Sequence, residues 1–91
     1  MKVIWTLSAE DCLDNIVNYI AEDNIDAALN MDALLRSSAK ELMRFPCKGR
    51  IGRVKGTREL IAHPNYIIVY TVNNHLIKII SILHGSQQYP Q

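Results

Sequence analysis

Residues 66–83 read Tyr-Ile-Ile-Val-Tyr-Thr-Val-Asn-Asn-His-Leu-Ile-Lys-Ile-Ile-Ser-Ile-Leu, and this stretch decides the fold class. β-Branched and aromatic residues fill both of its halves, which we predict to be strands at Tyr66–Val72 and Leu76–Leu83. Asn73-Asn74 between them indicates a tight hairpin, because asparagine tolerates the positive φ that such turns need. The first strand is apolar on both faces, which is typical of a central strand covered from both sides.

Apolar residues at helical spacing predict two helices upstream of this hairpin. We expect the first helix to start at Ser8, whose hydroxyl can cap free N–H groups, and to stop near residues 22–24. Asn24 can cap the second helix, which we expect to run through Arg44 because Pro46 prevents its continuation. The two helices are therefore predicted to form a hairpin.

Two further strands complete the predicted order, at Lys2–Thr6 and at about Arg53–Ala62. The order β-α-α-β-β-β on one core indicates an α+β domain. We therefore predict a helical hairpin packed on one face of a mainly antiparallel, four-stranded sheet.

The composition fits one small domain spanning residues 1–91, because 48% of the residues are hydrophobic and 21% are charged. No apolar stretch approaches the roughly 18 residues that a membrane span needs, and no secretory signal is recognisable, so a cytoplasmic location is expected. Cys12 and Cys47 share no short spacing with another Cys or His, so neither a disulfide nor a zinc site is predicted. No cofactor is expected.

Charge is divided unevenly along the chain. Residues 1–45 hold four cations and eight anions, whereas residues 46–91 hold six cations and only Glu59 as an anion. The positions predicted to bind a target or phosphate are the five clustered cations Lys48, Arg50, Arg53, Lys55 and Arg58. A bulge at Gly56 would decide whether the last three share one surface, and the sequence leaves that register open.

Few residues remain for catalysis, because nucleotide-binding loops, nucleophile elbows and metal-ligand spacings are missing from the sequence. His84 and Tyr89 near the C-terminus could serve as acid and base in RNA cleavage, with Arg58 stabilising the developing charge. In the structural alternative, His84 caps the last strand and Tyr89 holds the tail on the sheet.

Two motifs carry a resemblance to a known family. Residues 52–60 read Gly-Arg-Val-Lys-Gly-Thr-Arg-Glu-Leu, and residues 83–90 read Leu-His-Gly-Ser-Gln-Gln-Tyr-Pro. In combination they resemble the RelE/ParE superfamily of toxins from type II toxin–antitoxin modules, and the similarity spans nearly the whole chain. The resemblance implies the RelE-like fold, a cognate antitoxin as partner and a toxin–antitoxin hetero-oligomer.

The superfamily holds two activities: RelE-type members cut mRNA in the ribosomal A site, and ParE-type members block DNA gyrase. The nucleases use Lys and Arg on central strands and an Arg, His or Tyr near the C-terminus. Here Tyr66–Val72 carries no cation, and no Arg or Lys follows His84. The resemblance therefore favours a non-enzymatic, ParE-like gyrase inhibitor that arrests bacterial growth. The alternatives are a metal-independent, ribosome-dependent mRNA endonuclease and a non-toxic antitoxin-binding module.

Overall fold

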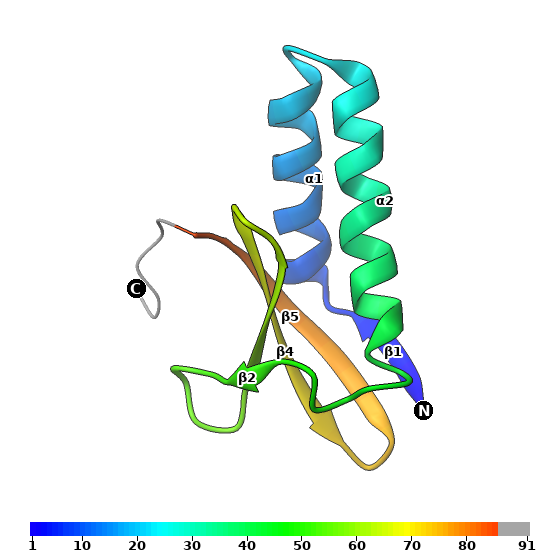
Figure 1. Ribbon diagram of the computed structural model, residues 1–91, viewed down its shortest axis with the longest axis vertical. Coiled ribbons are helices and arrows are strands. Elements are labelled where there is room, and N and C mark those ends of the chain that lie inside the picture. Colours follow the sequence, from blue (N-terminus) through cyan, green and yellow to red (C-terminus); the bar gives the residue numbers. More distant parts are fainter. Residues whose placement is uncertain (86–91) are drawn as a thin grey trace.

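The chain builds a helical hairpin and a five-stranded sheet, packed as two layers (Figure 1). The computed structural model describes residues 1–85. The elements in chain order are β1 (Lys2–Trp5), α1 (Leu7–Ala21), α2 (Ile25–Glu41), β2 (Arg50–Ile51), β3 (Arg58–His63), β4 (Tyr66–Asn73) and β5 (Leu76–His84). This arrangement confirms the predicted α+β class and the predicted helical hairpin.

The sheet order is β1-β5-β4-β3-β2, with β4 in the middle as predicted. Neighbouring strands are antiparallel except for β1, which pairs with β5 in parallel. The predicted count of four strands was one short, because β2 is only two residues long and lies between glycines.

The strand predicted at Arg53–Ala62 begins later than expected, at Arg58. Residues 52–57 form a turn instead, in which the Gly52 amide donates to the Thr57 carbonyl at 2.8 Å. Gly56 has φ +84° in this turn, a conformation that costs glycine little. Gly56 therefore reverses the chain before the strand, and it is not a bulge within one.

The structure confirms the predicted start of the second helix and moves the start of the first. α1 begins at Leu7 because Thr6, rather than Ser8, is its N-cap: the Thr6 hydroxyl accepts from the Ala9 amide at 3.1 Å. Asn24 caps α2 as expected, accepting from the Ala27 amide at 3.0 Å. α2 ends at Glu41, three residues before the expected Arg44. Turns with i→i+3 hydrogen bonds follow it, since the chain must tighten before Pro46.

The β4–β5 hairpin is confirmed, with its turn one residue later than expected. The positive φ angles belong to Asn74 (45°) and His75 (62°), because Asn73 still pairs with Leu76 as the last residue of β4. Asparagine and histidine are both among the residues that occupy this region more often than most.

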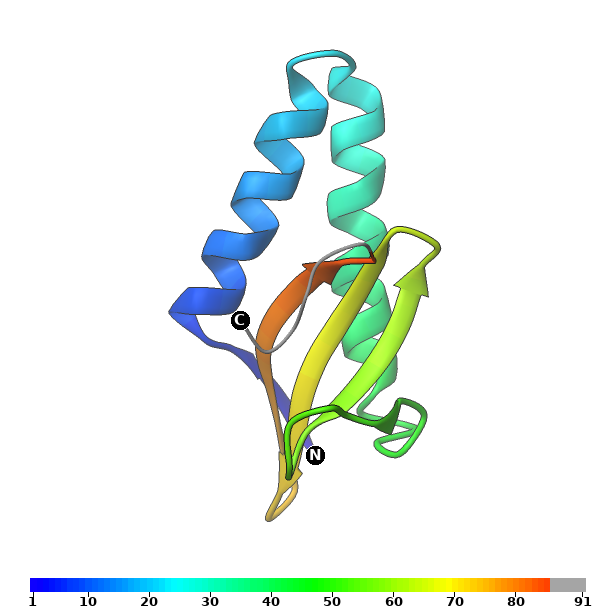
Figure 2. The same ribbon diagram turned by 90° about the vertical axis from the view of Figure 1, so that its left-hand side faces the viewer.

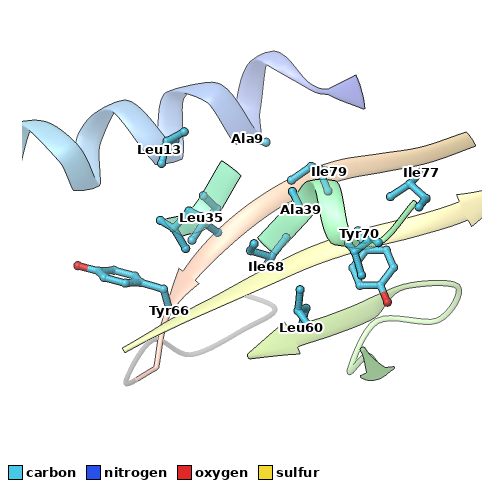
Figure 3. Packing of buried hydrophobic residues seen from close by; sticks show 12 residues of the cluster. Ala9, Leu13, Leu35, Ala39, Leu60, Tyr66, Ile68, Tyr70, Ile77 and Ile79 are labelled. Carbon is cyan, nitrogen blue, oxygen red and sulfur yellow. The ribbon is translucent and has the colours of Figure 1, made fainter. Parts of the chain in front are cut away.

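Buried side chains from both layers form the main core (Figure 3). Leu13 of α1 and Leu35 of α2 belong to the same cluster as Ile68 of β4 and Ile79 of β5. A second cluster of Ile67, Val69 and Leu83 is also buried. β4 therefore contributes buried side chains to both of its faces, as the unbroken apolar run predicted.

The acidic α1–α2 turn and the basic segment lie toward opposite ends of the molecule. Figure 1 places the α1–α2 turn, with Glu22, Asp23 and Asp26 nearby in the sequence, at one end of the longest axis. The loop between α2 and β3 lies toward the other end, and Figure 2 shows it beside the strand ends, away from the α1–α2 turn. The fold thus presents the basic segment at the edge of the sheet.

Candidate functional site

The candidate site is the basic loop, which we define as residues 46–57 between α2 and β3. The side chain of Tyr70, on β4, holds the first part of this loop in place. The Tyr70 hydroxyl donates to the Pro46 carbonyl at 2.7 Å and accepts from the Gly49 amide at 2.9 Å. Burial raises the pKa of Tyr70, so the hydroxyl stays protonated and can donate. One buried side chain therefore holds two points of the loop backbone.

The loop approaches the sheet so closely at Gly49 that no side chain fits there. A Cβ at this position would lie 2.7 Å from the Tyr70 hydroxyl oxygen and 2.9 Å from the Glu59 carbonyl oxygen. Real Cβ atoms essentially never come this close to such atoms. Glycine is required at position 49 because only a residue without a side chain lets the backbone pack directly against Tyr70 and β3. An unusual φ angle is not the reason.

Glu59 of β3 holds the second part of the loop and is buried, with a side chain only 1% exposed. Its Oε1 accepts from the Arg50 guanidinium at 3.1 Å and lies 3.4 Å from Nε of Arg53. Its Oε2 accepts from the Arg53 backbone amide at 3.0 Å. Both carboxylate oxygens are thus engaged by the basic loop.

The surroundings of Glu59 keep it ionised. Burial by itself raises the pKa of this carboxyl, but the Arg53 amide and the guanidinium groups of Arg50 and Arg53 lower it by more. The net pKa lies below the ordinary value for glutamate. A negative charge therefore remains under the loop at neutral pH and partly neutralises two of its arginines.

The five predicted target-binding cations divide into two groups. Arg50 and Arg53 are paired with Glu59, and Arg58 donates to the Gly49 carbonyl at 2.8 Å. Lys48 and Lys55 are exposed. Arg50 and Arg53 are exposed as well, with 52% and 39% of their side chains accessible, so these arginines hold the loop and still add to its outward positive charge.

His84 lies apart from this loop. It pairs with Tyr66 in the β4–β5 register, whereas Arg58 pairs with Tyr70 in the β3–β4 register. Four strand residues separate these positions, which is roughly 13 Å at about 3.3 Å per residue. The structure does not bring His84 and Arg58 together, and Tyr89 lies outside the described residues.

A cavity of about 320 Å³ lies beside His84, between α1 and the ends of β4 and β5. His84 contacts Tyr66 edge-on, with ring centroids 5.6 Å apart. The thiol of Cys12 in the cavity wall lies 3.7 Å from the Ser81 hydroxyl. Within residues 1–85, no cluster of three His, Cys, Asp or Glu side chains is arranged to hold a metal ion.

Two residues of the site were not predicted from the sequence. Tyr70 was interpreted only as an apolar residue of a central strand, and nothing in the sequence marks its hydroxyl as an anchor. Glu59 did carry a signal, since it is the one anion in the basic half of the chain. A lone carboxylate among six cations is expected to pair with one or more of them, and in the structure it pairs with Arg50 and Arg53.

Residues 3–89 match the family model described as the ParE toxin of the type II toxin–antitoxin system parDE. The chain belongs to this ParE toxin family. Y4kP of Sinorhizobium fredii is 40% identical over 91 residues, covering 99% of this chain and 94% of that protein. Toxin RelE2 of Caulobacter vibrioides is 34% identical over 86 residues, covering 94% of this chain and 97% of that protein.

The fold agrees with a solved ParE-family complex. A chain from the chromosomal ParDE toxin–antitoxin system of P. aeruginosa superimposes with a TM-score of 0.82 at 25% identity. The alignment covers 92% of this chain and 95% of that chain. The expected RelE/ParE resemblance is confirmed, and membership in the ParE family implies an antitoxin partner. No helix within residues 1–85 is long and apolar enough to span a membrane.

Proposed function

We propose that this ParE-family toxin arrests bacterial growth in the cytoplasm by binding DNA gyrase, and that a cognate antitoxin neutralises it. On this proposal the protein acts by binding and performs no chemistry. The basic loop and its exposed lysines are the surface that meets the target.

The observation that carries the proposal is the separation of the loop cations from the candidate proton-transfer group. General acid–base catalysis requires a group within about 2.6–3.2 Å of the atom it serves. Arg58 is bonded to a backbone carbonyl of the loop, and His84 lies roughly 13 Å away along the sheet. This arrangement supports a binding surface better than an RNA-cleaving site.

Charge also supports a binding role for the loop. Glu59 partly neutralises Arg50 and Arg53, which stay exposed, so the outward field of the loop comes from Lys48 and Lys55 together with these two arginines. Exposed lysines on a loop whose backbone is anchored at several points steer an acidic partner toward it. A rigid, moderately basic protrusion suits an acidic protein surface.

Two assays on the purified protein separate the target classes. The proposal expects inhibition of gyrase supercoiling and intact mRNA on programmed ribosomes. Codon-linked cleavage in the A site with supercoiling unchanged would establish the endonuclease alternative instead. An absence of both effects in a folded protein that still binds its antitoxin would identify a non-toxic binding module.

Variants test which residues contribute to growth arrest. Replacing Lys48 and Lys55 together with alanine should weaken arrest, whereas His84→Gln should leave most of it. Lys2→Ala is the control for loss of a lysine elsewhere, to be compared with each single lysine variant, because Lys2 lies on β1 at the opposite edge of the sheet. Loss of arrest in a folded His84→Gln protein, with arrest intact in the double lysine variant, would contradict the proposal.

A further inference from the structure

The cavity beside His84 has no role in the proposed function, although it is large enough to hold a ligand. Its volume is about 320 Å³, and it lies between α1 and the ends of β4 and β5. Pockets that bind small molecules in proteins range from about 300 to 1,000 Å³. The cavity is therefore of the size that suits a molecule of one or two rings.

The side chain of Tyr66 ends in this cavity with a hydroxyl that has no partner. Tyr66 is only 9% exposed, yet its hydroxyl makes no hydrogen bond within residues 1–85. Every fully buried side-chain nitrogen or oxygen among these residues has a partner, so the Tyr66 oxygen must be reached from the cavity. Figure 3 shows this oxygen at the far end of the ring, pointing away from the other labelled core residues. A ligand that supplies the missing hydrogen bond is therefore favoured there.

Neighbouring rings fix the direction of the Tyr66 side chain. His63 on β3 and His84 on β5 both pair with Tyr66 on β4, so the three residues form one row across the sheet. The ring centroid of Tyr66 lies 5.7 Å from that of His63 and 5.6 Å from that of His84. The His63 ring is held in turn, because its Nδ1 accepts from the Asn65 amide at 3.0 Å. The Tyr66 hydroxyl is thus in place before a ligand arrives, which reduces the entropy lost on binding.

The other walls of the cavity select for a neutral, partly aromatic ligand. Ile16 of α1 and Ile82 of β5 provide aliphatic surface, and Asn15 provides a neutral amide. Tyr19, which is 75% exposed, adds an aromatic ring on the α1 side. The described lining contains no Asp, Glu, Lys or Arg. A charged ligand would lose its hydration there without gaining an ion-pair partner, whereas a flat ring packs well against other rings.

We propose that this cavity binds a small, neutral aromatic molecule that carries a carbonyl group, such as an aromatic carboxamide. The ring of the ligand packs against Tyr19 and the two isoleucines, and its carbonyl oxygen accepts a hydrogen bond from the Tyr66 hydroxyl. The site requires neither gyrase nor an antitoxin, so it is a second binding function beside the one proposed above.

Benzamide is the probe for this site, titrated into the ¹⁵N-labelled protein and followed by NMR. We expect saturable shifts of the backbone amides of residues 12–19, 66 and 82–84, which surround the cavity. A ligand of this size should bind with a Kd on the order of 1 mM. Benzoate, which is charged, and cyclohexanecarboxamide, which has no aromatic ring, should each bind about fivefold more weakly or less tightly still.

The two free cysteines provide a second readout. Cys12 lies in the cavity wall, whereas Cys47 is exposed in the basic loop. Benzamide should slow the alkylation of Cys12 by N-ethylmaleimide in proportion to the fraction of protein that is occupied. Alkylation of Cys47 should continue at its original rate. Mass spectrometry of the digested protein measures both rates in one sample.

Variants test the contacts proposed for the ligand. Tyr66→Phe removes the hydroxyl and keeps the ring, and it should weaken benzamide binding about fivefold. Tyr19→Ala removes the exposed ring and should weaken binding about threefold or more. Asn18→Ala is the matched control, since Asn18 is exposed on the same helix and does not line the cavity; it should leave the affinity unchanged. Circular dichroism confirms the folding of each variant.

Shifts confined to other surfaces, equal binding of benzoate, or full affinity in a folded Tyr66→Phe variant would overturn the proposal. Tighter binding of N-acetyltyrosinamide than of benzamide would overturn it in favour of a tyrosine side chain from a protein partner. If Tyr66→Phe does not fold, protection of Cys12 in the unmodified protein decides alone. None of these readouts uses gyrase or growth, so they can fail while gyrase inhibition is still observed.

Discussion

Tyr70→Phe is the sharpest test of how the basic loop is held. The substitution removes one oxygen and with it two hydrogen bonds, to the Pro46 carbonyl and from the Gly49 amide. Each such bond contributes about 0.5–1.5 kcal/mol, and a buried amide left unpaired costs about 1–3 kcal/mol. Because Gly49 is buried, we expect the free energy of unfolding to fall by about 2 kcal/mol.

For a chain of 91 residues, that loss corresponds to a decrease in Tm of about 8–16 °C. Thermal unfolding followed by circular dichroism measures it, and hydrogen exchange at Gly49 should accelerate as the loop loses its anchor. The loop would then be less ordered, and growth arrest should weaken even though no exposed residue has changed.

Tyr66→Phe supplies the matched control on the same strand. The Tyr66 ring is buried as well, but its hydroxyl makes no hydrogen bond within residues 1–85 and borders the cavity near His84. Its removal should change stability by less than about 0.5 kcal/mol. Equal destabilisation by the two substitutions, or unchanged exchange at Gly49 in Tyr70→Phe, would refute the anchoring role.

Three further outcomes follow from the contacts described above. The pKa of Glu59 is lower in the folded state than in the unfolded state, so ionised Glu59 stabilises the fold. The full stabilisation is present at pH values above the ordinary glutamate pKa of about 4.3, and it is lost as the pH falls through the pKa of the folded state. Urea unfolding at pH 7, 5 and 3 should therefore show a steeper acid loss in the unmodified protein than in Glu59→Gln. Gly49→Ala should lower Tm more than Gly56→Ala, because a Cβ at Gly49 meets backbone and ring atoms whereas one at Gly56 meets open space and only strains φ. Asn24→Ala should cost about 1 kcal/mol by calorimetry through loss of the α2 cap, with exposed Asn30→Ala as the near-neutral comparison.

The sequence correctly predicted those helices, strands and turns that depend on the pattern of neighbouring residues. The apolar run of β4, the asparagine-containing turn after it and the helical spacing of Leu13 and Leu35 each indicated the element that the structure contains. The start of α1 was misplaced because Thr6 is held by a partner distant in the chain, the Ile79 carbonyl, to which its hydroxyl donates at 2.9 Å. No local pattern contains that contact.

The site was harder to predict for the same reason. The sequence indicates no partner for Glu59, since its neighbour Arg58 lies on the opposite face of the strand. Its actual partner Arg50 lies opposite it on β2, a strand too short to detect in the sequence. Arg58 belongs to the basic cluster in the sequence, but its bond to the Gly49 carbonyl depends on how the loop returns to the sheet. The contacts of each cation depend on how strands distant in the sequence pair with one another. The composition of the basic segment does not reveal that pairing.

The pairing of β1 with β5 joins the first strand of the fold to its last. Lys2–Trp5 lies beside Leu76–Ile79, and the Thr6 hydroxyl bonds to the Ile79 carbonyl. During synthesis the N-terminal strand must wait, unpaired, until residues 76–84 have left the ribosome. The helical hairpin can form earlier from local contacts, but the sheet beneath it cannot be completed. The toxin fold therefore cannot be completed until residues 76–84 have been synthesised, which leaves an interval in which an antitoxin already present can meet the nascent chain.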